Sequence, residues 1–156
     1  MRTNSSSVAT KYQHSQVSHA DPVQLIVLLY DGALSRIAQG RQRLQEKDLP
    51  HAGVAISKAQ AIVGELRQSL NMDAGGEVAK NLNSLYAYVH DLLAKAMREN
   101  LAEPLEEATN LLNELRGAWS EVAKQAKAVF ETNQTAVRSQ GAAGGNQDAT
   151  RVQLKA

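Results

Sequence analysis

Apolar residues recur at alternating spacings of three and four along four stretches of this chain, and short breaks separate the stretches. This spacing places the apolar side chains on one face of an α-helix. The breaks, at 48–50, 73–76 and 100–104, contain proline, glycine, asparagine or aspartate, which are typical of helix ends. Asp21 and Pro22 precede the first stretch as an N-cap and a first helical residue. The pattern predicts four helices, the first running to about Lys47.

The predicted buried seams give the order and direction of packing. They comprise Ile26, Tyr30, Ala33, Ile37 and Leu44; Ala52, Ala55, Ala59, Ile62, Leu66 and Leu70; Val78, Leu82, Leu85, Val89, Leu92 and Ala96; and Leu105, Ala108, Leu112, Leu115, Trp119, Val122, Ala126 and Val129. Short breaks between long helices make successive helices antiparallel. Aromatic residues make up only 4% of the chain, with 10 Gly and 3 Pro, which disfavours a sheet. The fold class expected is an all-α, antiparallel up-down four-helix bundle.

The two ends of the chain differ from the middle in composition. Residues 1–20 are mostly polar, and we expect a flexible N-terminal segment with a few apolar points. Residues 134–156 contain Gly141, Gly144 and Gly145 among Ala, Gln and Thr, and are predicted to form a disordered tail. The four-helix domain is therefore expected to span residues 21–133.

Composition excludes several classes of function. There is no cysteine, so disulfides and thiolate chemistry are ruled out. Seventeen Lys and Arg balance 16 Asp and Glu without a basic run, which argues against nucleic-acid binding. The longest apolar run is far too short to span a bilayer, and the polar N-terminus does not resemble a signal peptide. No histidine has a glutamate three residues before it, and no nucleophile or phosphate-loop motif is present. We expect a cytoplasmic protein without enzymatic activity, metal or cofactor.

The predicted helices carry more apolar side chains than the core of a four-helix bundle requires. The run from Leu25 to Tyr30 surrounds the first helix with apolar side chains, whereas a core-facing helix needs a single stripe. Ile56, Val63, Tyr86 and Tyr88 also lie beyond the predicted seams. The surplus has two interpretations that the pattern leaves open. It is either a thick core covered by Val8, Tyr12 and Val17, or a groove for an amphipathic segment of another chain. Gly32 is expected to let another backbone approach closely.

Four sequence blocks then resemble one protein family. Residues 25–33 (LIVLLYDGA), which follow Asp21-Pro22, are similar to the signature of the flagellar secretion chaperone FliS family. Residues 58–66 (KAQAIVGEL), 75–89 (GGEVAKNLNSLYAYV) and 111–119 (LLNELRGAW) resemble the later blocks of that family in the same order. The resemblance covers about residues 12–125. The combination of blocks is specific, although each block alone is weak.

The resemblance implies a holding chaperone that binds the disordered C-terminal segment of flagellin, prevents premature polymerisation and presents the subunit to the flagellar type III export gate. It implies no cofactor. The residues expected to line the flagellin groove are Leu25, Leu28, Leu29, Tyr30, Gly32, Ala33, Ile56, Val63, Leu82, Leu85, Tyr86 and Val89. The residues expected to cover the groove and to take part in gate docking are Val8, Ala9, Tyr12 and Val17.

Two alternative functions remain open at the level of sequence. One is a structural helical bundle that uses its extra apolar surface to self-associate, and weak homo-oligomerisation of the free protein is compatible with either class. The other is an adaptor for a different secreted helical segment.

Overall fold

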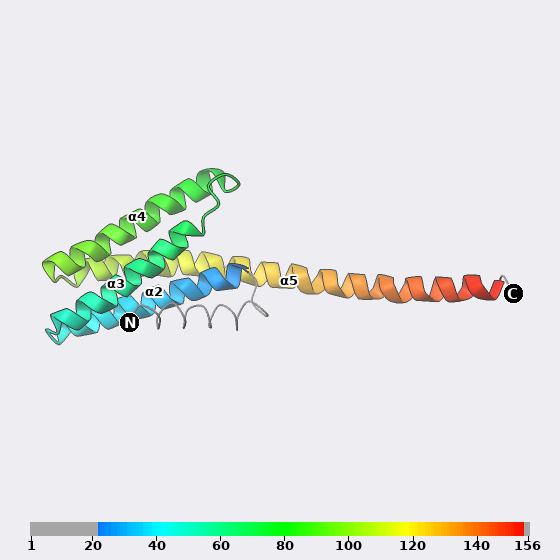
Figure 1. Cartoon of the computed structure of the whole chain (residues 1–156), viewed down its shortest axis with the longest axis horizontal. Helices are drawn as coiled ribbons and strands as arrows, with labels where there is room; N and C mark the ends of the chain where they lie inside the picture. Colours follow the sequence, from blue (N-terminus) through cyan, green and yellow to red (C-terminus); the bar gives the residue numbers. More distant parts are fainter. Residues whose placement is uncertain (1–21, 155–156) are drawn as a thin grey trace, which may run out of the picture. The chain divides into compact units, whose positions relative to one another are not determined.

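The computed structural model describes residues 22–154, which form four α-helices and no strand. The helices are α2 (Pro22–Gln45), α3 (Leu49–Gln68), α4 (Gly76–Glu99) and α5 (Glu103–Leu154) (Figure 1). The predicted all-α four-helix bundle is confirmed. Of the described helices, none combines the length and the apolar character needed to cross a membrane.

The connections between helices follow from local chemistry. Lys47 turns the chain with φ 59°, and Asp48 then caps α3 by accepting the backbone N–H of His51 at 3.4 Å. Asn100 ends α4 in the left-handed conformation, with φ 54°. At the start of α4, Gly76 has φ 52°, and a Cβ on Gly75 would meet the carbonyl oxygen of Asn71 at 2.7 Å. Both positions therefore require glycine, as expected for a helix that stops and restarts.

The structure divides into two units, Met1–Ser120 and Glu121–Ala156. In the first unit, α3 packs along α2 and against α4. Two ion pairs join α2 to the first part of α5, namely Asp31 with Arg116 and Arg41 with Glu106. The core of this unit consists of Tyr30, Ala33, Ile37, Ile56, Ala59, Val63, Leu66, Tyr86, Val89, Leu92, Leu93, Ala96, Leu105, Ala108 and Leu112.

The buried face of α4 is wider than the predicted seam and misses its first residue. Val78 was expected in the core, but it is 67% exposed, and Ala79 is buried in its place. Tyr86 and Leu93 are buried outside the predicted seam. Of the seam itself, Val89, Leu92 and Ala96 are buried as predicted, whereas Leu85 is half-buried. The reason is that residues 82–93 carry apolar side chains on more than one stripe, so the pattern permits either orientation.

Corrections of the same kind apply to α3 and α5. Ile56 and Val63 are fully buried on α3, whereas the predicted seam residue Ile62 is half-buried. On α5, the predicted seam residues Val122 and Val129 are 45% and 60% exposed. The core in the described residues therefore draws on α5 mainly through Leu105, Ala108 and Leu112, near its start.

The close approach expected at Gly32 occurs at another glycine. A Cβ on Gly32 would lie 3.4 Å from Ile62 Cδ1, which is an ordinary side-chain contact, so the prediction for Gly32 is wrong. A Cβ on Gly40 would lie only 2.7 Å from Ile56 Cγ1. Of the two glycines of α2, Gly40 is therefore the one against which α3 packs closely.

The second unit is the continuation of α5. The helix runs to Leu154, through the region from 134 for which the composition predicts a disordered tail. Alanine, glutamine and arginine in this region favour helix, and no proline interrupts it. The unit boundary after Ser120 also lies ahead of the expected domain boundary at residue 133.

Candidate functional site

The twelve residues expected to line a groove separate into two sets by burial. Six of them are fully buried in the core and have no accessible surface for a partner: Tyr30, Ala33, Ile56, Val63, Tyr86 and Val89. The other six are half-buried: Leu25, Leu28, Leu29, Gly32, Leu82 and Leu85. Local sequence cannot separate the sets, because both contain large apolar side chains at helical spacing.

The buried set is organised around two tyrosines. Their hydroxyl oxygens, on Tyr30 of α2 and Tyr86 of α4, lie 2.5 Å apart, and their ring centroids are 6.3 Å apart. Trp119 of α5 interacts with both hydroxyl groups. These long side chains connect three helices in one layer, so that both polar tips have partners inside the core. Their position makes them structural residues of the bundle.

Burial alters the chemistry of these two hydroxyls. Desolvation raises the pKa of Tyr30 far above its usual range, and the neighbouring Tyr86 adds to the effect. Desolvation also raises the pKa of Tyr86. Both hydroxyls are therefore neutral throughout the physiological pH range, and neither serves as a proton donor or acceptor toward solvent.

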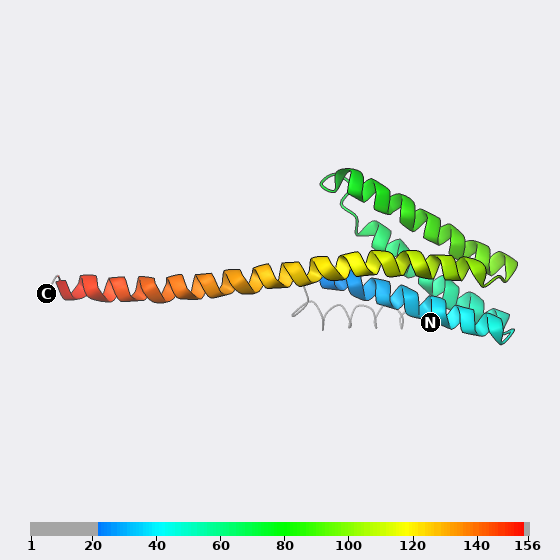
Figure 2. The same ribbon diagram turned by 180° about the vertical axis from the view of Figure 1, so that it is seen from behind.

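The half-buried set lies at the starts of α2 and α4. Leu25, Leu28, Leu29 and Gly32 belong to the first three turns of α2, and Leu82 and Leu85 to the second and third turns of α4. We call these six residues the apolar rim. The end of α3 lies at the same end of the bundle as the start of α2, and α3 is followed there by the start of α4. Both parts of the rim therefore lie at that end of the bundle (Figure 1). Figure 2 shows from behind that α4 approaches α5 at its last turns and diverges from it toward its start.

Further apolar side chains support this end of the bundle. Ile26, Ile62, Leu70 and Trp119 are half-buried and pack against the core, as do Leu29 and Leu82 of the rim. None of these four was among the expected groove residues, although Ile26 lies within the apolar run at the start of the first helix. Their partial exposure enlarges the apolar surface that a partner would meet.

Two arginines beside the rim have side-chain partners. Arg116 of α5 forms an ion pair with Asp31, one residue before Gly32, and this carboxylate raises the pKa of the guanidinium group. Arg67 Nε, near the end of α3, donates to Asn83 Oδ1 of α4 at 2.6 Å. The rim itself contains no charged side chain. Its chemistry therefore suits an apolar ligand face and offers no site for an anion.

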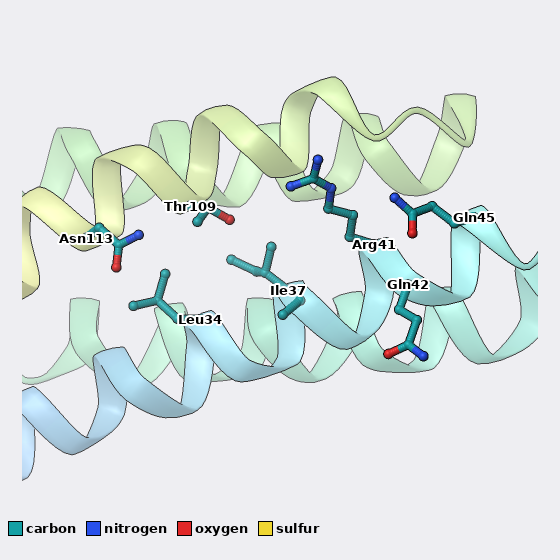
Figure 3. A pocket seen from close by; sticks show the side chains of 8 residues that line it. Leu34, Ile37, Arg41, Gln42, Gln45, Thr109 and Asn113 are labelled. Atoms are coloured by element: carbon teal, nitrogen blue, oxygen red, sulfur yellow. The ribbon is translucent and has the colours of Figure 1, made fainter.

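Apart from the rim, the first unit has a recess between α2 and the start of α5. It has a volume of about 570 Å³ and is lined by Leu34, Ile37, Ala38, Arg41, Gln42, Gln45, Thr109 and Asn113 (Figure 3). Its cation, Arg41, is bound to Glu106 at 2.5 Å. Local sequence does not indicate this recess, since it combines the polar flank of one helix with residues of another far along the chain.

Val8, Ala9, Tyr12 and Val17, the expected groove cover, lie outside the described residues. Tyr88, which the sequence placed beyond the seam, is 45% exposed, and its hydroxyl donates to Glu107 of α5. Across residues 22–142, histidine and carboxylate side chains nowhere gather in a group of three that could hold a metal ion.

Comparisons with known proteins all give the same family, and the matches cover most of the chain. A model of the family described as flagellar protein FliS matches residues 4–126. The flagellar secretion chaperone FliSB of Pseudomonas aeruginosa is 41% identical over 105 residues, which cover 67% of this chain and 83% of that protein. The flagellar secretion chaperone FliS of Salmonella typhimurium is 38% identical over 113 residues, covering 72% and 84%. That of Vibrio cholerae is 32% identical over 108 residues, covering 69% and 79%.

Proposed function

Because this chain belongs to the flagellar protein FliS family, we propose that it is a cytoplasmic flagellar export chaperone that holds the C-terminal segment of flagellin on the apolar rim. The observation that carries the proposal is the uncharged, half-buried rim at the end of the bundle where α2 and α4 begin. Chaperones of this class act by binding, and the proposal assigns no catalytic step to any residue.

The rim has the character needed to bind an amphipathic segment. Helix-in-groove recognition requires apolar anchors spaced along a helical face. Leu25, Leu28 and Gly32 follow one another at spacings of three and four on α2, and Leu82 and Leu85 are three residues apart on α4. A flagellin segment that folds into a helix would bury these side chains together with its own apolar face.

The energetics favour binding to a disordered segment. Fully burying a leucine side chain contributes roughly 1.5–3 kcal/mol, so completing the burial of five leucines contributes several kcal/mol. Coupled folding of a disordered segment costs about 2–5 kcal/mol. The difference between these two free energies corresponds to a moderate affinity. Such an affinity suits a protein that must later release its subunit to the export gate.

The holding function would follow from occupancy. A flagellin segment that is bound to the rim cannot at the same time pack against neighbouring subunits, so polymerisation is prevented before export. Presentation to the type III export gate, and the covering role of Val8, Ala9, Tyr12 and Val17, belong to the same proposal. They rest on the family relationship.

Rim variants with a matched surface control test the proposal. Leu28→Glu and Leu85→Glu each place a charge in the rim, and glutamate keeps a helix propensity close to that of leucine. Titration calorimetry with a flagellin C-terminal fragment should show affinities about 10–100-fold below wild type, the equivalent of losing one leucine contact. Val54→Glu places the same charge on a position of α3 that is 53% exposed and outside the rim, and it should bind as wild type does.

Two results would contradict the proposal. If both rim variants keep a cooperative thermal transition and bind flagellin as tightly as wild type, the rim is not the flagellin site. If wild type binds no flagellin but forms a complex with another secreted flagellar protein, the adaptor alternative is correct. Complex stoichiometry from light scattering during size-exclusion chromatography distinguishes these cases.

A further inference from the structure

In the second unit of the chain, α5 carries four large apolar side chains that are exposed, whereas the smaller Ala123 is buried. Val122, Val129, Phe130 and Val137 are large apolar residues that expose 45%, 60%, 63% and 68% of their surface. They recur at intervals of seven residues: Val129 follows Val122, and Val137 follows Phe130. A helix with such a repeat presents one continuous stripe, which is the pattern of a helix that packs against another helix.

The charged residues of the same segment all lie away from this stripe. With Ala126, Asn133 and Gln140 at heptad position a, the valines at 122 and 129 occupy position d and the residues at 130 and 137 occupy position e. The five charged residues of this segment, Glu121, Lys124, Lys127, Glu131 and Arg138, then fall at positions b, c and f. The face that contains positions a, d, e and g carries no charge from Val122 to Gln140.

The segment lies largely beyond the part of the chain that the family shares. The match to the FliS family ends at residue 126, four residues after the stripe begins. Flagellin binding, as proposed above, uses residues of the first unit. The exposed stripe therefore requires a separate explanation.

We infer that residues 122–140 of α5 pair with the same segment of a second copy of this chain, in a parallel, in-register coiled coil. The absence of charge from the contacting face means that two identical copies meet without like-charge repulsion. Asn133 supports the choice of occupant and register. In a parallel pair it lies opposite Asn133 of the other copy, where the two side-chain amides can bond to each other, whereas an unrelated apolar helix would leave this amide unpaired.

The size of the face sets the strength of the pairing. From Val122 to Gln140 the helix is about 28 Å long at 1.5 Å per residue. Only four large apolar side chains per copy are available, so the contact is smaller than the ~1,200–2,000 Å² of a stable complex. The dimer is therefore weak, and its population depends on protein concentration.

Sedimentation equilibrium of the full chain over ~1–500 μM tests the inference. Wild type should shift from monomer to dimer, and Phe130→Glu and Val129→Glu should each weaken dimerisation at least tenfold. Ala128→Glu, which adds the same charge at outer position c, should dimerise as wild type does. A wild-type protein that stays monomeric at the highest concentration would overturn the inference, as would equal loss in all three variants.

Cysteine crosslinking tests the register independently, because the natural chain contains no cysteine. Under mild oxidation, Ala136→Cys at position d should form a disulfide-linked dimer, while Thr135→Cys at outer position c should crosslink at least tenfold more slowly. Equal rates would indicate random collision and contradict the register. If Phe130→Glu instead lowers flagellin affinity tenfold without changing self-association, the face belongs to flagellin and the inference is wrong.

Discussion

At the scale of single residues, the two buried tyrosines are the polar groups on which the core most depends. Tyr30 and Tyr86 are 0% and 1% exposed, and each hydroxyl has a partner. Burial would be costly for an unpaired hydroxyl, but the pair and Trp119 satisfy each other. The same burial makes the neutral form of each tyrosine a condition of folding.

The raised pKa values predict a loss of stability in alkaline solution. Above pH ~10, tyrosines of the unfolded chain lose their protons while Tyr30 and Tyr86 keep theirs. The native state then binds more protons than the unfolded state, so the free energy of unfolding falls as pH rises, by up to about 1.4 kcal/mol per pH unit for each tyrosine. Below pH ~10 this contribution is fully present.

Urea unfolding between pH 8 and 11 measures the effect. The double variant Tyr30→Phe/Tyr86→Phe removes both hydroxyls together and should lose stability less steeply above pH 10 than wild type. Tyr88→Phe, at an exposed position, should keep most of the wild-type slope because water screens its charge. An unchanged slope in the double variant would mean that other groups cause the alkaline transition.

At the scale of helices, packing decides which residue of an apolar pair faces inward. On α4 the pairs 78/79, 85/86 and 92/93 each contain two apolar residues, and the core takes Ala79, Tyr86 and Leu93 most completely. The contact with Tyr30 explains why Tyr86 is buried, because it brings residue 86 toward α2. Val78, by contrast, is exposed.

Gly40 and Gly64 make a matched test of helix packing. Alanine at Gly40 would place Cβ 2.7 Å from Ile56 Cγ1, and overpacking of a core typically costs about 1–3 kcal/mol. Alanine at Gly64 would meet no atom within 4 Å and should stabilise the helix by about 0.5–1 kcal/mol. Thermal unfolding should therefore give a lower Tm for Gly40→Ala and a higher Tm for Gly64→Ala. Equal stabilisation in both variants would show that Ile56 yields without cost.

At the scale of the whole molecule, the two units are expected to carry separate interactions. All of the apolar rim and the core of α2 to α5 lie within the first unit, whereas the apolar stripe belongs to the second. A truncation in the second unit should therefore affect self-association without affecting the proposed flagellin site.

Deletion of residues 134–156 tests this separation. The truncated chain should keep the thermal transition of wild type and bind flagellin within about twofold of wild-type affinity, because the deleted residues contribute no rim side chain. It should lose concentration-dependent dimerisation, because the last seven residues of the paired segment, including Val137, are removed. A tenfold weaker flagellin affinity, about 1.4 kcal/mol, would show that the C-terminal part of α5 takes part in flagellin binding.

Local chemistry in the sequence was sufficient for the helices, the breaks between them and the family. Proline at 22 and 50, the glycines at 75 and 76, and Asn100 act on their own backbone or their nearest neighbours, so their effects can be read without the fold. The family blocks are also contiguous in sequence. The helical bundle and the family could therefore be predicted.

Burial required the tertiary structure, because it depends on residues far apart in the chain. Tyr30 and Tyr86 are 56 positions apart, and their contact assigns both to the core, whereas Leu28 and Leu85, with equally apolar side chains, remain half-exposed. The same holds for α5, where one uninterrupted pattern of apolar spacing contains buried Leu112 and exposed Val129. Periodicity shows that a helix has an apolar face, but only the presence or absence of a packed neighbour decides whether that face is core or free surface.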